Sequence, residues 1–334
     1  MLRVMTAFLW FALAPQVHAN ACAVQENNFD PPPAREEGPV KVNVHVYLND
    51  LTEIRDAKES FVGDVFMRAE WMDSRLAHAG PEPCSADPGQ IWTPHLQILN
   101  RREMDQIGEQ QLVVLPDGSV RQVVRVFGDF SFHQNLTDFP FDQQRLSFVL
   151  ASALGPHEVQ LLAESQNIGT ADRLSVANWR ISTIGGHSSE RYIAPVERTL
   201  STLEIDFLAE RLTGFYTWQL LVPLVLVVMM TWTVFWLPLE HAAPRVGLVA
   251  TSMLTLIAYR FSMSSVLPPI AYLTRLDKFM VAASVLVFGA LAAAVAVTYL
   301  DHHGRDASAN RLNQISRVLA PLAFVAVYVA VFLS

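Results

Sequence analysis

The sequence contains little charge for its length, and the charge that it has is unevenly placed. Only 17% of the 334 residues are charged and 51% are hydrophobic, a balance that excludes an ordinary soluble protein. Most of the acidic residues lie before Gly214, and few charges of either sign follow it. The net charge of −8 disfavours nucleic acid as a partner. We therefore expect a soluble amino-terminal half and a membrane-embedded carboxy-terminal half.

Cysteine and the motifs of enzymes are also scarce. Cys22 and Cys84 are the only cysteines. Two cysteines make no disulfide framework, so a pair and two free thiols both remain open, with lipid modification of Cys22 as a third alternative. The chain has no nucleophile elbow, no His-Glu-x-x-His and no Cys/His cluster. The sequence therefore predicts no enzyme, no cofactor and no metal site.

The first 19 residues are typical of a secretory signal peptide. Arg3 precedes a short apolar core, and the small-residue ending Val17-His18-Ala19 predicts cleavage after residue 19. The apolar core is too short to span a bilayer, so we expect the half that follows to be exported. Residues 20–39 are rich in Pro and acidic side chains and are expected to form a flexible lead-in.

Residues 40–211 carry the pattern of a β-sandwich. From Val40 to Tyr47, apolar and polar residues alternate with a period of two, which marks a half-buried strand. Pro116-Asp117-Gly118 is a hairpin signal between two later strands. Further strands are expected near 61–75, 96–100, 109–115, 119–132, 144–151, 159–162, 178–184 and 200–210. Many strands without intervening helices predict a sandwich of about 180 residues.

After Arg211 the sequence changes to four apolar segments of membrane-spanning length. They cover about 214–237, 244–267, 279–300 and 315–333, within a membrane domain of residues 212–334. The predicted fold class is a β + α membrane protein, an extracellular immunoglobulin-like β-sandwich followed by a four-helix transmembrane bundle. We expect a multi-pass protein of the plasma (inner) membrane, with its amino-terminal domain extracellular or periplasmic.

The second apolar segment differs from the others in its many hydroxyl side chains. At about 100° per residue, one stripe of this helix is small and polar in its first half and bulky in its second. The stripe consists of Gly247, Thr251, Leu254, Ala258, Phe261 and Ser265. Several copies around an axis would form a wet tube in which Leu254 and Phe261 make apolar rings that gate by dewetting. The alternative is a helix that packs its small residues against neighbouring helices.

Motifs along most of the chain resemble those of the pentameric ligand-gated ion channels. Phe139-Pro140-Phe141-Asp142 looks like the family's signature loop at the boundary between sandwich and membrane. Phe132 and Leu146 stand where animal members carry the two cysteines of this loop, so the loop is similar to that of prokaryotic members. The other matches, in order, are Ile91-Trp92-Thr93-Pro94, Arg211, Pro223 and Leu267-Pro268 with Tyr272. The chain thus resembles a prokaryotic, cysteine-free member of the Cys-loop receptor superfamily.

This resemblance implies a homopentamer in membrane lipid that passes inorganic ions along its axis. It also implies that the junction of sandwich and helices couples agonist binding to the pore. The residues at the matching positions are Glu59, Asp142, Arg211, Pro268 and Tyr272. Arg211 beside Glu59 or Asp142 would form a buried ion pair, which costs roughly 3–5 kcal/mol to break from one side. A surface cluster of charges, worth little, is the alternative.

The resemblance also places the agonist site between subunits, in a box of aromatic side chains where a cation sits over ring faces. Phe66 and Tyr192, the latter on a loop expected at 185–195, fit two box positions, and Leu99 stands where an aromatic is usual. The box is incomplete, which disfavours an amine agonist, and both aromatics as packing residues are an equal alternative. Protons are the other candidate agonist, because Glu59 matches a residue implicated in pH gating of a related channel. The histidines considered as proton sensors are His95, His133, His157 and His187.

Ion selectivity depends on the inner end of the pore helix, at Glu240, Ala243 and Arg245. Cation channels of the family carry a Glu beside the basic residue, whereas no acid adjoins Arg245, and the run Ala-Ala-Pro-Arg-Val-Gly-Leu looks like the anion-selective receptors. A ring of Glu240 at the cytoplasmic mouth favours cations instead. We expect a ligand- or pH-gated channel for small monovalent ions that favours cations. An anion-selective channel and a non-conducting membrane-anchored receptor are the alternatives.

Overall fold

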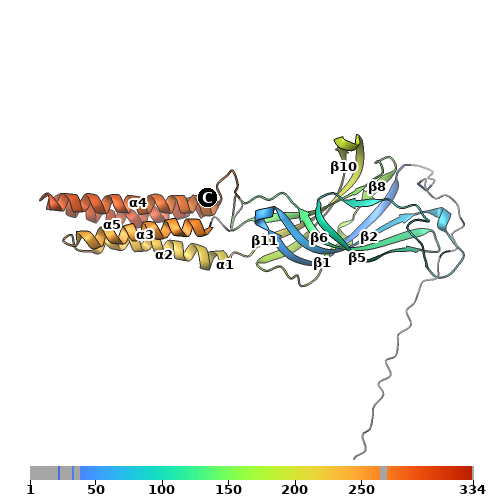
Figure 1. The fold of residues 1–334 in the computed structure, drawn as a ribbon, viewed down its shortest axis with the longest axis horizontal. Coiled ribbons are helices and arrows are strands. Elements are labelled where there is room, and N and C mark those ends of the chain that lie inside the picture. Colours follow the sequence, from blue (N-terminus) through green and yellow to red (C-terminus); the bar gives the residue numbers. More distant parts are fainter. Residues whose placement is uncertain (1–21, 23–31, 34–37, 264–268, 333–334) are drawn as a thin grey trace, which may run out of the picture.

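The computed structural model describes residues 22, 32–33, 38–263 and 269–332 (Figure 1). A β-sandwich occupies one end of the elongated molecule and a bundle of helices occupies the other. The last helix brings the chain back to the end of the bundle that faces the sandwich. The signal peptide expected at residues 1–19 lies outside the described residues, as does most of the expected lead-in.

Two β-sheets form the sandwich in the described part of the chain. The larger sheet has the order β3-β5-β6-β2-β1-β8, with β9 paired to β1, and the smaller has the order β10-β11-β7-β4. The strands of the larger sheet are β1 (Val40–Arg55), β2 (Ser60–Met72), β3 (Cys84–Ser85), β5 (Arg101–Val114), β6 (Ser119–Ser131), β8 (Val159–Leu162) and β9 (Ile168–Thr170). Those of the smaller sheet are β4 (Leu96–Ile98), β7 (Gln143–Ser152), β10 (Trp179–Ile193) and β11 (Arg198–Arg211).

Alternation along the strands builds the core between the sheets. The β1 valines from Val40 to Val46 are buried, and the residues between them are exposed or half-buried. Aromatic rings meet edge to face across the core, as with Phe61 and Phe148, whose centroids lie 5.2 Å apart. Phe132 and Leu146, at the positions of the missing loop cysteines, both belong to this core. The predicted β-sandwich is confirmed.

Two strands are longer than the sequence predicted. β10 was expected to end at Ile184, but it continues to Ile193 and pairs with β11 from Trp179 opposite Arg211 to Ile193 opposite Arg198. The loop predicted at 185–195 is therefore wrong, and most of it is a strand of a long hairpin. The far part of β10 is exposed and has no buried face, so it shows no hydrophobic period. The first half of β5 is also exposed and likewise shows no hydrophobic period. The sequence therefore predicted the start of this strand at 109, although it begins at Arg101.

The described residues contain four helical spans long and apolar enough to cross a bilayer, as predicted. The first combines α1 (Gly214–Tyr216), a π-helical turn (Thr217–Leu221), α2 (Val222–Trp232) and a 3₁₀ turn (Thr233–Trp236). The others are α3 (Ala242–Met263), α4 (Arg275–His302) and α5 (Asp306–Phe332). The π-turn ends two residues before Pro223, which lacks the N–H that a regular helix would use there.

The last two helices begin earlier than predicted. α4 starts at Arg275 rather than 279, because Thr274 caps it: its hydroxyl oxygen accepts from the Asp277 N–H and the Asp277 carboxylate accepts from the Thr274 N–H. α5 starts at Asp306 rather than 315. Its first turns are polar, and a search for apolar runs finds the membrane-crossing part of a helix rather than its full length. Residues 264–267 of the predicted second span lie outside the described residues.

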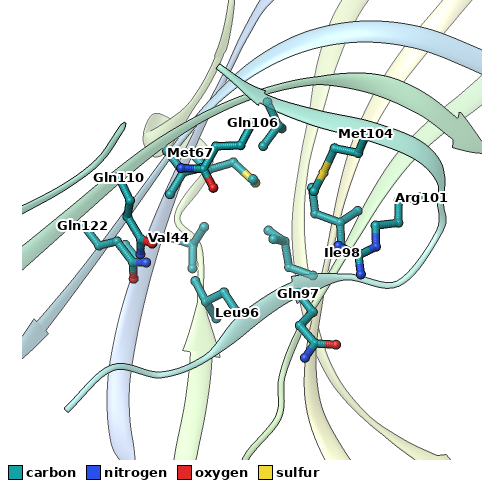
Figure 2. Close-up of a pocket in the computed structure, with 14 residues that line it drawn as sticks. Val44, Met67, Leu96, Gln97, Ile98, Arg101, Met104, Gln106, Gln110 and Gln122 are labelled. Carbon is teal, nitrogen blue, oxygen red and sulfur yellow. The ribbon is translucent and has the colours of Figure 1, made fainter. Parts of the chain in front are cut away.

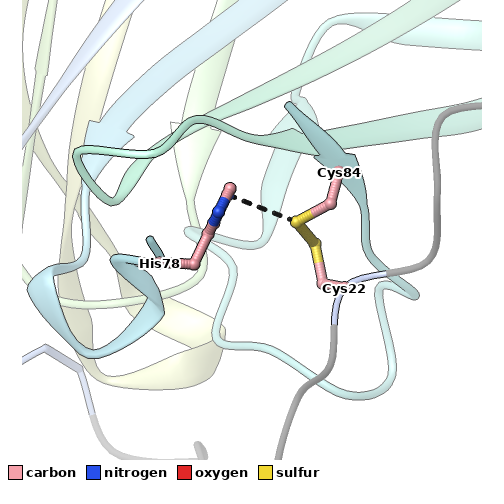
Figure 3. Close-up of a disulfide and its surroundings, with 3 residues drawn as sticks. All are labelled: Cys22, His78 and Cys84. Carbon is pink, nitrogen blue, oxygen red and sulfur yellow. Dashed lines mark hydrogen bonds between the residues drawn. A yellow bond between two sulfur atoms is a disulfide. The ribbon is translucent and has the colours of Figure 1, made fainter. Parts of the chain in front are cut away.

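The structure settles the pairing of the cysteines (Figure 3). Cys22 and Cys84 form a disulfide between residues 62 positions apart, and no cysteine in the described residues is free. The Cys22 N–H also donates to the Ser85 carbonyl at 2.9 Å, and His78 Nε2 lies 3.5 Å from Cys84 Sγ. The start of the described chain is thus fastened to the sandwich, and the crosslink restricts the unfolded chain.

Candidate functional site: the α3 face and the sandwich–membrane junction

Within one subunit, α3 has an exposed face and a buried face. The described members of the predicted stripe are all exposed, namely Gly247, Thr251, Leu254, Ala258 and Phe261. Leu254 is 68% exposed and Phe261 is 74% exposed. The opposite side of the helix, with Val249, Ser252 and Leu256, is buried against the rest of the subunit. Ser265 lies outside the described residues, so five of the six predicted positions share one outward face of α3.

The hydroxyl groups of α3 bond to their own helix. Thr251, Ser252 and Thr255 each donate to the carbonyl four residues earlier, at 2.9 Å. Such bonds satisfy a hydroxyl even in an apolar environment. Hydroxyl content alone therefore does not require water beside the helix, and the evidence for a wet face is the exposed mixture of small, polar and bulky residues.

At the inner end of α3, the side chain of Arg245 lies inside the subunit. Arg245 is 0% exposed, and its guanidinium donates to Asn313 Oδ1 at 2.7 Å and to the Leu237 carbonyl at 3.3 Å. Arg245 therefore lies at the inner end of α3, as expected, but its side chain points into the subunit rather than onto the exposed face. At 100° per residue Arg245 falls on the buried side of α3, about 180° from Leu254. Glu240 and Ala243 are exposed, as a residue at the mouth must be.

At the junction, Arg211 is the centre of a buried cluster. Its side chain donates to Asp142 through Nε at 2.8 Å and Nη2 at 3.1 Å, and to Asp56 at 2.9 and 3.0 Å. The side chains of Arg211 and Asp142 are only 1% and 2% exposed. The guanidinium also stacks over Trp179 at 4.1 Å and over Phe139 at 4.9 Å. The predicted ion pair with Asp142 is present, and it is buried rather than a surface contact.

The charges of this cluster hold Arg211 in its ionised form. Burial alone would lower the pKa of Arg211, but hydrogen bonds to Asp56 and Asp142 outweigh it and raise the pKa above its ordinary value. Asp142 also accepts from Gln144 Nε2 at 2.6 Å, and Asp56 accepts from Gln134 Nε2. A buried cation that is satisfied on every side keeps its geometry, because losing one partner leaves another charge unpaired.

The loop that carries Asp142 also contacts the membrane helices. The Leu136 N–H donates to the Tyr272 hydroxyl at 3.0 Å. Arg275, the first residue of α4, donates through its N–H to the Thr137 carbonyl at 2.9 Å and through Nε to Asp138 at 2.8 Å. Tyr272, predicted as a coupling residue, thus touches the same loop whose other end holds Arg211.

One predicted coupling residue, Glu59, stands apart from this cluster. Glu59 is exposed, and its backbone carbonyl accepts from the Phe132 N–H at 3.1 Å. Arg211 bonds instead to Asp56, three residues earlier, which the sequence reasoning missed because the tight turn between β1 and β2 decides which acid points inward. Pro268 lies outside the described residues.

The two predicted ligand residues lie on different sheets. Phe66 is on β2 of the larger sheet, and Tyr192, 62% exposed, is near the tip of the β10–β11 hairpin. The Arg125 guanidinium lies 5.0 Å over the Phe66 ring and also pairs with Asp64 at 2.6 Å. One ring face of Phe66 therefore already carries a cation of its own subunit.

Beside Phe66, the larger sheet carries a cluster of charges that sequence reasoning missed. His45 lies 3.1 Å from Arg68 and 3.5 Å from Glu70, and Glu70 also pairs with Arg121 at 2.7 Å. The pKa of His45 is held below its usual value, first by partial burial and next by the charge of Arg68. The strand register brings these residues together, since His45 is opposite Arg68 and Glu70 is opposite Arg121.

The chain consists of a β-sandwich followed by four helices long enough to cross a membrane, with a buried ion-pair cluster where the two parts meet. This architecture is that of a membrane receptor with an extracellular domain. The model of the neurotransmitter-gated ion-channel ligand binding domain matches residues 24–213. The model of the neurotransmitter-gated ion-channel transmembrane region matches residues 220–329. These two matches cover most of the chain, which belongs to the neurotransmitter-gated ion-channel family as a prokaryotic-type, pentameric ligand-gated channel of the Cys-loop superfamily.

Individual relatives are distant but extensive. The proton-gated ion channel of Gloeobacter violaceus is 23% identical over 327 residues, covering 96% of this chain and 88% of the relative. The pH-sensitive chloride channel 2 of Anopheles gambiae is 25% identical over 297 residues, covering 83% of this chain and 48% of the relative. The human gamma-aminobutyric acid receptor subunit rho-3 is 24% identical over 323 residues, covering 91% and 68%. The protein is therefore a ligand-gated ion channel embedded in a membrane.

Proposed function

We propose that the protein forms a homopentameric channel in which five copies of α3 line the ion pathway. The exposed face of α3 carries this proposal. Within the apolar stretches of α4 and α5, bulky apolar side chains such as Val285, Phe288 and Leu322 make up most of the exposed face, although Gly289 and Ala292 of α4 are also exposed. The exposed face of α3 instead mixes Gly247 and Thr251 with large apolar residues, which fits a wet conduit better than lipid.

Leu254 and Phe261 supply the gate of this proposed pore. They are seven residues apart, so two turns of helix separate the two rings that five subunits would form. A narrow apolar ring excludes water and thereby stops ions without a plug. The test is current through purified protein in planar bilayers, scanned from about pH 4 to about pH 10 and with amine and carboxylate ligands. Absence of current under all these conditions would favour the non-conducting receptor instead.

The proposed pore favours cations. With Arg245 turned into the subunit, the exposed charge near the inner end of α3 is the carboxylate of Glu240. A ring of five carboxylates attracts cations and repels anions. The name of the Anopheles gambiae relative, a chloride channel, favours the anion-selective alternative. The reversal potential under a potassium chloride gradient separates the two, because its sign follows the more permeant ion.

Two kinds of agonist fit the extracellular domain. Phe66 and Tyr192 lie on different sheets, and their proposed common site is the aromatic box between neighbouring subunits that the family resemblance implies. Arg125 over Phe66 disfavours an amine there. Protons are the second kind, favoured by the name of the Gloeobacter violaceus relative and by His45 in the charge cluster beside Phe66. A pH step without any ligand distinguishes them, since only a proton-gated channel then opens.

Arg211 with Asp142 and Asp56 is the proposed coupling element. The cluster joins the last strand of the sandwich, the turn after β1 and the loop that touches Tyr272 and Arg275. A displacement of the sandwich strands therefore acts on the loop at the top of α4 through a connection that is costly to break.

A further inference from the structure

One buried charge differs from every other polar group that the fold leaves without a full set of partners. Among the described residues, buried side-chain atoms without a hydrogen-bond partner lie on Ser60, Arg68, Trp71, Gln122, Asp129, Gln134, Arg245 and Thr298. The neutral Gln122 lines a cavity of about 220 Å³ inside the sandwich, where a water molecule has room (Figure 2). Of the three charged groups, Arg68 pairs with Glu70 and Asp129 pairs with Arg55. Arg245 alone has no ion-pair partner in the described part of the chain.

Neutral acceptors hold Arg245 inside the subunit. Its guanidinium donates to Asn313 Oδ1 at 2.7 Å and to the Leu237 carbonyl at 3.3 Å, and its Nε donates to nothing among the described residues. The charges that act on it from further away are Asp301 of α4 and Arg317 of α5, which have opposite signs. A buried cation without a counter-ion in contact is costly. The interior position of Arg245 is therefore weakly held for a charged group.

Exposed surface lies close to Arg245. The residue is in the first turn of α3, which begins at Ala242, and the preceding Glu240 and His241 are exposed. Side chains of a helix tilt toward its N-terminus, so the long arm of an arginine there can reach past the end of the helix. The N-terminus also carries the positive end of the helix dipole, which repels a cation. Hydration and the dipole of α3 thus both favour an Arg245 side chain that leaves the interior.

Asn313 is the side chain that opposes this release. It is buried within α5, where an asparagine is a poor helix former and packing alone does not require an amide. Its Nδ2 donates to the Phe235 carbonyl at 2.9 Å, which orients the amide so that Oδ1 faces Arg245. Arg317 Nε donates to the same carbonyl at 2.7 Å. A free carbonyl at the end of the first helical span therefore orients Asn313, and Asn313 orients Arg245.

We propose that Asn313 is a positioning residue for ion selectivity. It holds the Arg245 guanidinium inside the subunit, so the carboxylates of Glu240 are the charges that ions meet at the inner mouth. This inference rests on the proposed pore along α3 and on its proposed preference for cations. Without the bond to Asn313, the copies of Arg245 would add positive charge at the mouth and offset the ring of carboxylates. A residue of α5 thus determines selectivity through a residue of α3.

The first test measures whether Arg245 is released, and it needs no ion current. Phenylglyoxal modifies arginine side chains that water reaches, and mass spectrometry of peptides from the full-length protein gives the rate at each arginine. In the wild type, the exposed Arg180 should react and Arg245 should be protected. Asn313→Leu and Asn313→Ala should each raise the rate at Arg245 about tenfold or more, the effect of one hydrogen bond to a charged group.

Two matched variants control for a general loosening of α5. Asn313→Asp keeps an acceptor beside the guanidinium and should leave Arg245 protected. Gln314→Leu changes the next residue, which is exposed, and should also leave it protected. Using both Leu and Ala at Asn313 keeps the result independent of how one replacement packs.

The second test measures the reversal potential under a potassium chloride gradient. Asn313→Leu should move it toward the equilibrium potential of chloride, and Asn313→Asp should not. In an Arg245→Gln background, Asn313→Leu should add no shift, because no arginine remains to be released. A purely structural role of Asn313 would instead shift both backgrounds equally.

Two outcomes would overturn the proposal. One is an unchanged rate of modification at Arg245 in Asn313→Leu and Asn313→Ala. The other is an equal shift of the reversal potential with and without Arg245. A wild-type channel that prefers chloride would contradict the proposed cation preference instead, and the modification rates would still decide whether Asn313 holds Arg245.

Discussion

At the scale of single residues, Arg211 has more partners than any other charged group at the junction. Two carboxylates and three aromatic rings surround its guanidinium, and almost none of it reaches solvent. The sequence indicated the pair with Asp142, because a resemblance to known motifs marked both residues. It could not indicate Asp56, since which acid of a charged turn points inward depends on backbone angles that no residue pattern encodes.

Removing the cation should therefore destabilise the sandwich strongly. Arg211→Gln leaves Asp142 buried without its partner and is expected to lower the free energy of unfolding by about 3–5 kcal/mol. The matched control is Arg180→Gln, whose pair with Glu210 spans 3.4 Å on an exposed surface and should matter little. Denaturant titration followed by tryptophan fluorescence measures both. Similar small losses in the two variants would show that the Arg211 cluster is not a stabilising element.

His45 predicts a pH dependence. Its pKa in the folded chain lies below the usual 6.5, so between these two values the unfolded chain binds more protons than the folded chain. Stability should consequently fall as the pH drops from 6.5 toward the lower folded-state pKa. The loss should be smaller in His45→Gln, and His157→Gln, in an exposed loop, should behave like the wild type. The test compares the melting temperatures of the variants at about pH 7 and about pH 5. An equal fall in melting temperature in the wild type and in His45→Gln would contradict the role given to His45.

At the scale of elements, the angular position of each residue around α3 explains why the residues of the stripe share an exposed face and why the Arg245 side chain does not. The stripe from Gly247 to Phe261 was predictable, since a period of 3.6 places these residues on one side. The same period places Arg245 on the opposite side, where Asn313 of α5 binds it. Reading Arg245 as a mouth residue relied on its motif rather than on its phase. The far half of β10 was unpredictable for another reason, because only pairing with β11 defines it.

Leu254 is the residue of α3 whose change should most directly alter opening. Leu254→Ser replaces an apolar ring with a polar one, which lets water into the constriction, so the channel should open at lower agonist or proton concentration. Leu256→Ser is the contrasting variant, because Leu256 is buried within the subunit and should lower stability rather than ease opening. Dose–response curves in bilayers measure both. Unchanged or harder opening of Leu254→Ser would remove Leu254 from the gate.

At the scale of the whole molecule, the sandwich meets the bundle at the loop of residues 136–141 and at the end of β11. The loop at 136–139 forms hydrogen bonds with Tyr272 and Arg275. Arg211 is the last residue of β11, directly before the chain enters the first membrane helix. The order of sandwich and helices was predictable from hydropathy and strand periodicity. The disulfide at Cys22 was not, because two cysteines leave pairing and free thiols equally open until the chain is folded.

A single subunit cannot enclose a pore with one copy of α3, so the proposed function requires assembly. We expect native mass spectrometry of the detergent-solubilised protein to detect a complex of five chains. After denaturation, the same measurement should detect single chains. The exposed apolar residues of the bundle fit burial by lipid and by neighbouring subunits. A monomer or dimer that still conducts would rule out the five-fold pathway along α3.

The central claim is that the exposed side of α3 faces water in the assembled channel. Its most direct measurement is the rate at which a charged, water-soluble thiol reagent modifies single cysteines placed along α3, with ion current as the readout. Cysteines at Thr251, Leu254 and Ala258 should react and block the current, whereas those at Val249, Ser252 and Leu256 should not. Reaction confined to the second set, or to neither set, would place the exposed side of α3 in lipid or in a dry contact and contradict the account.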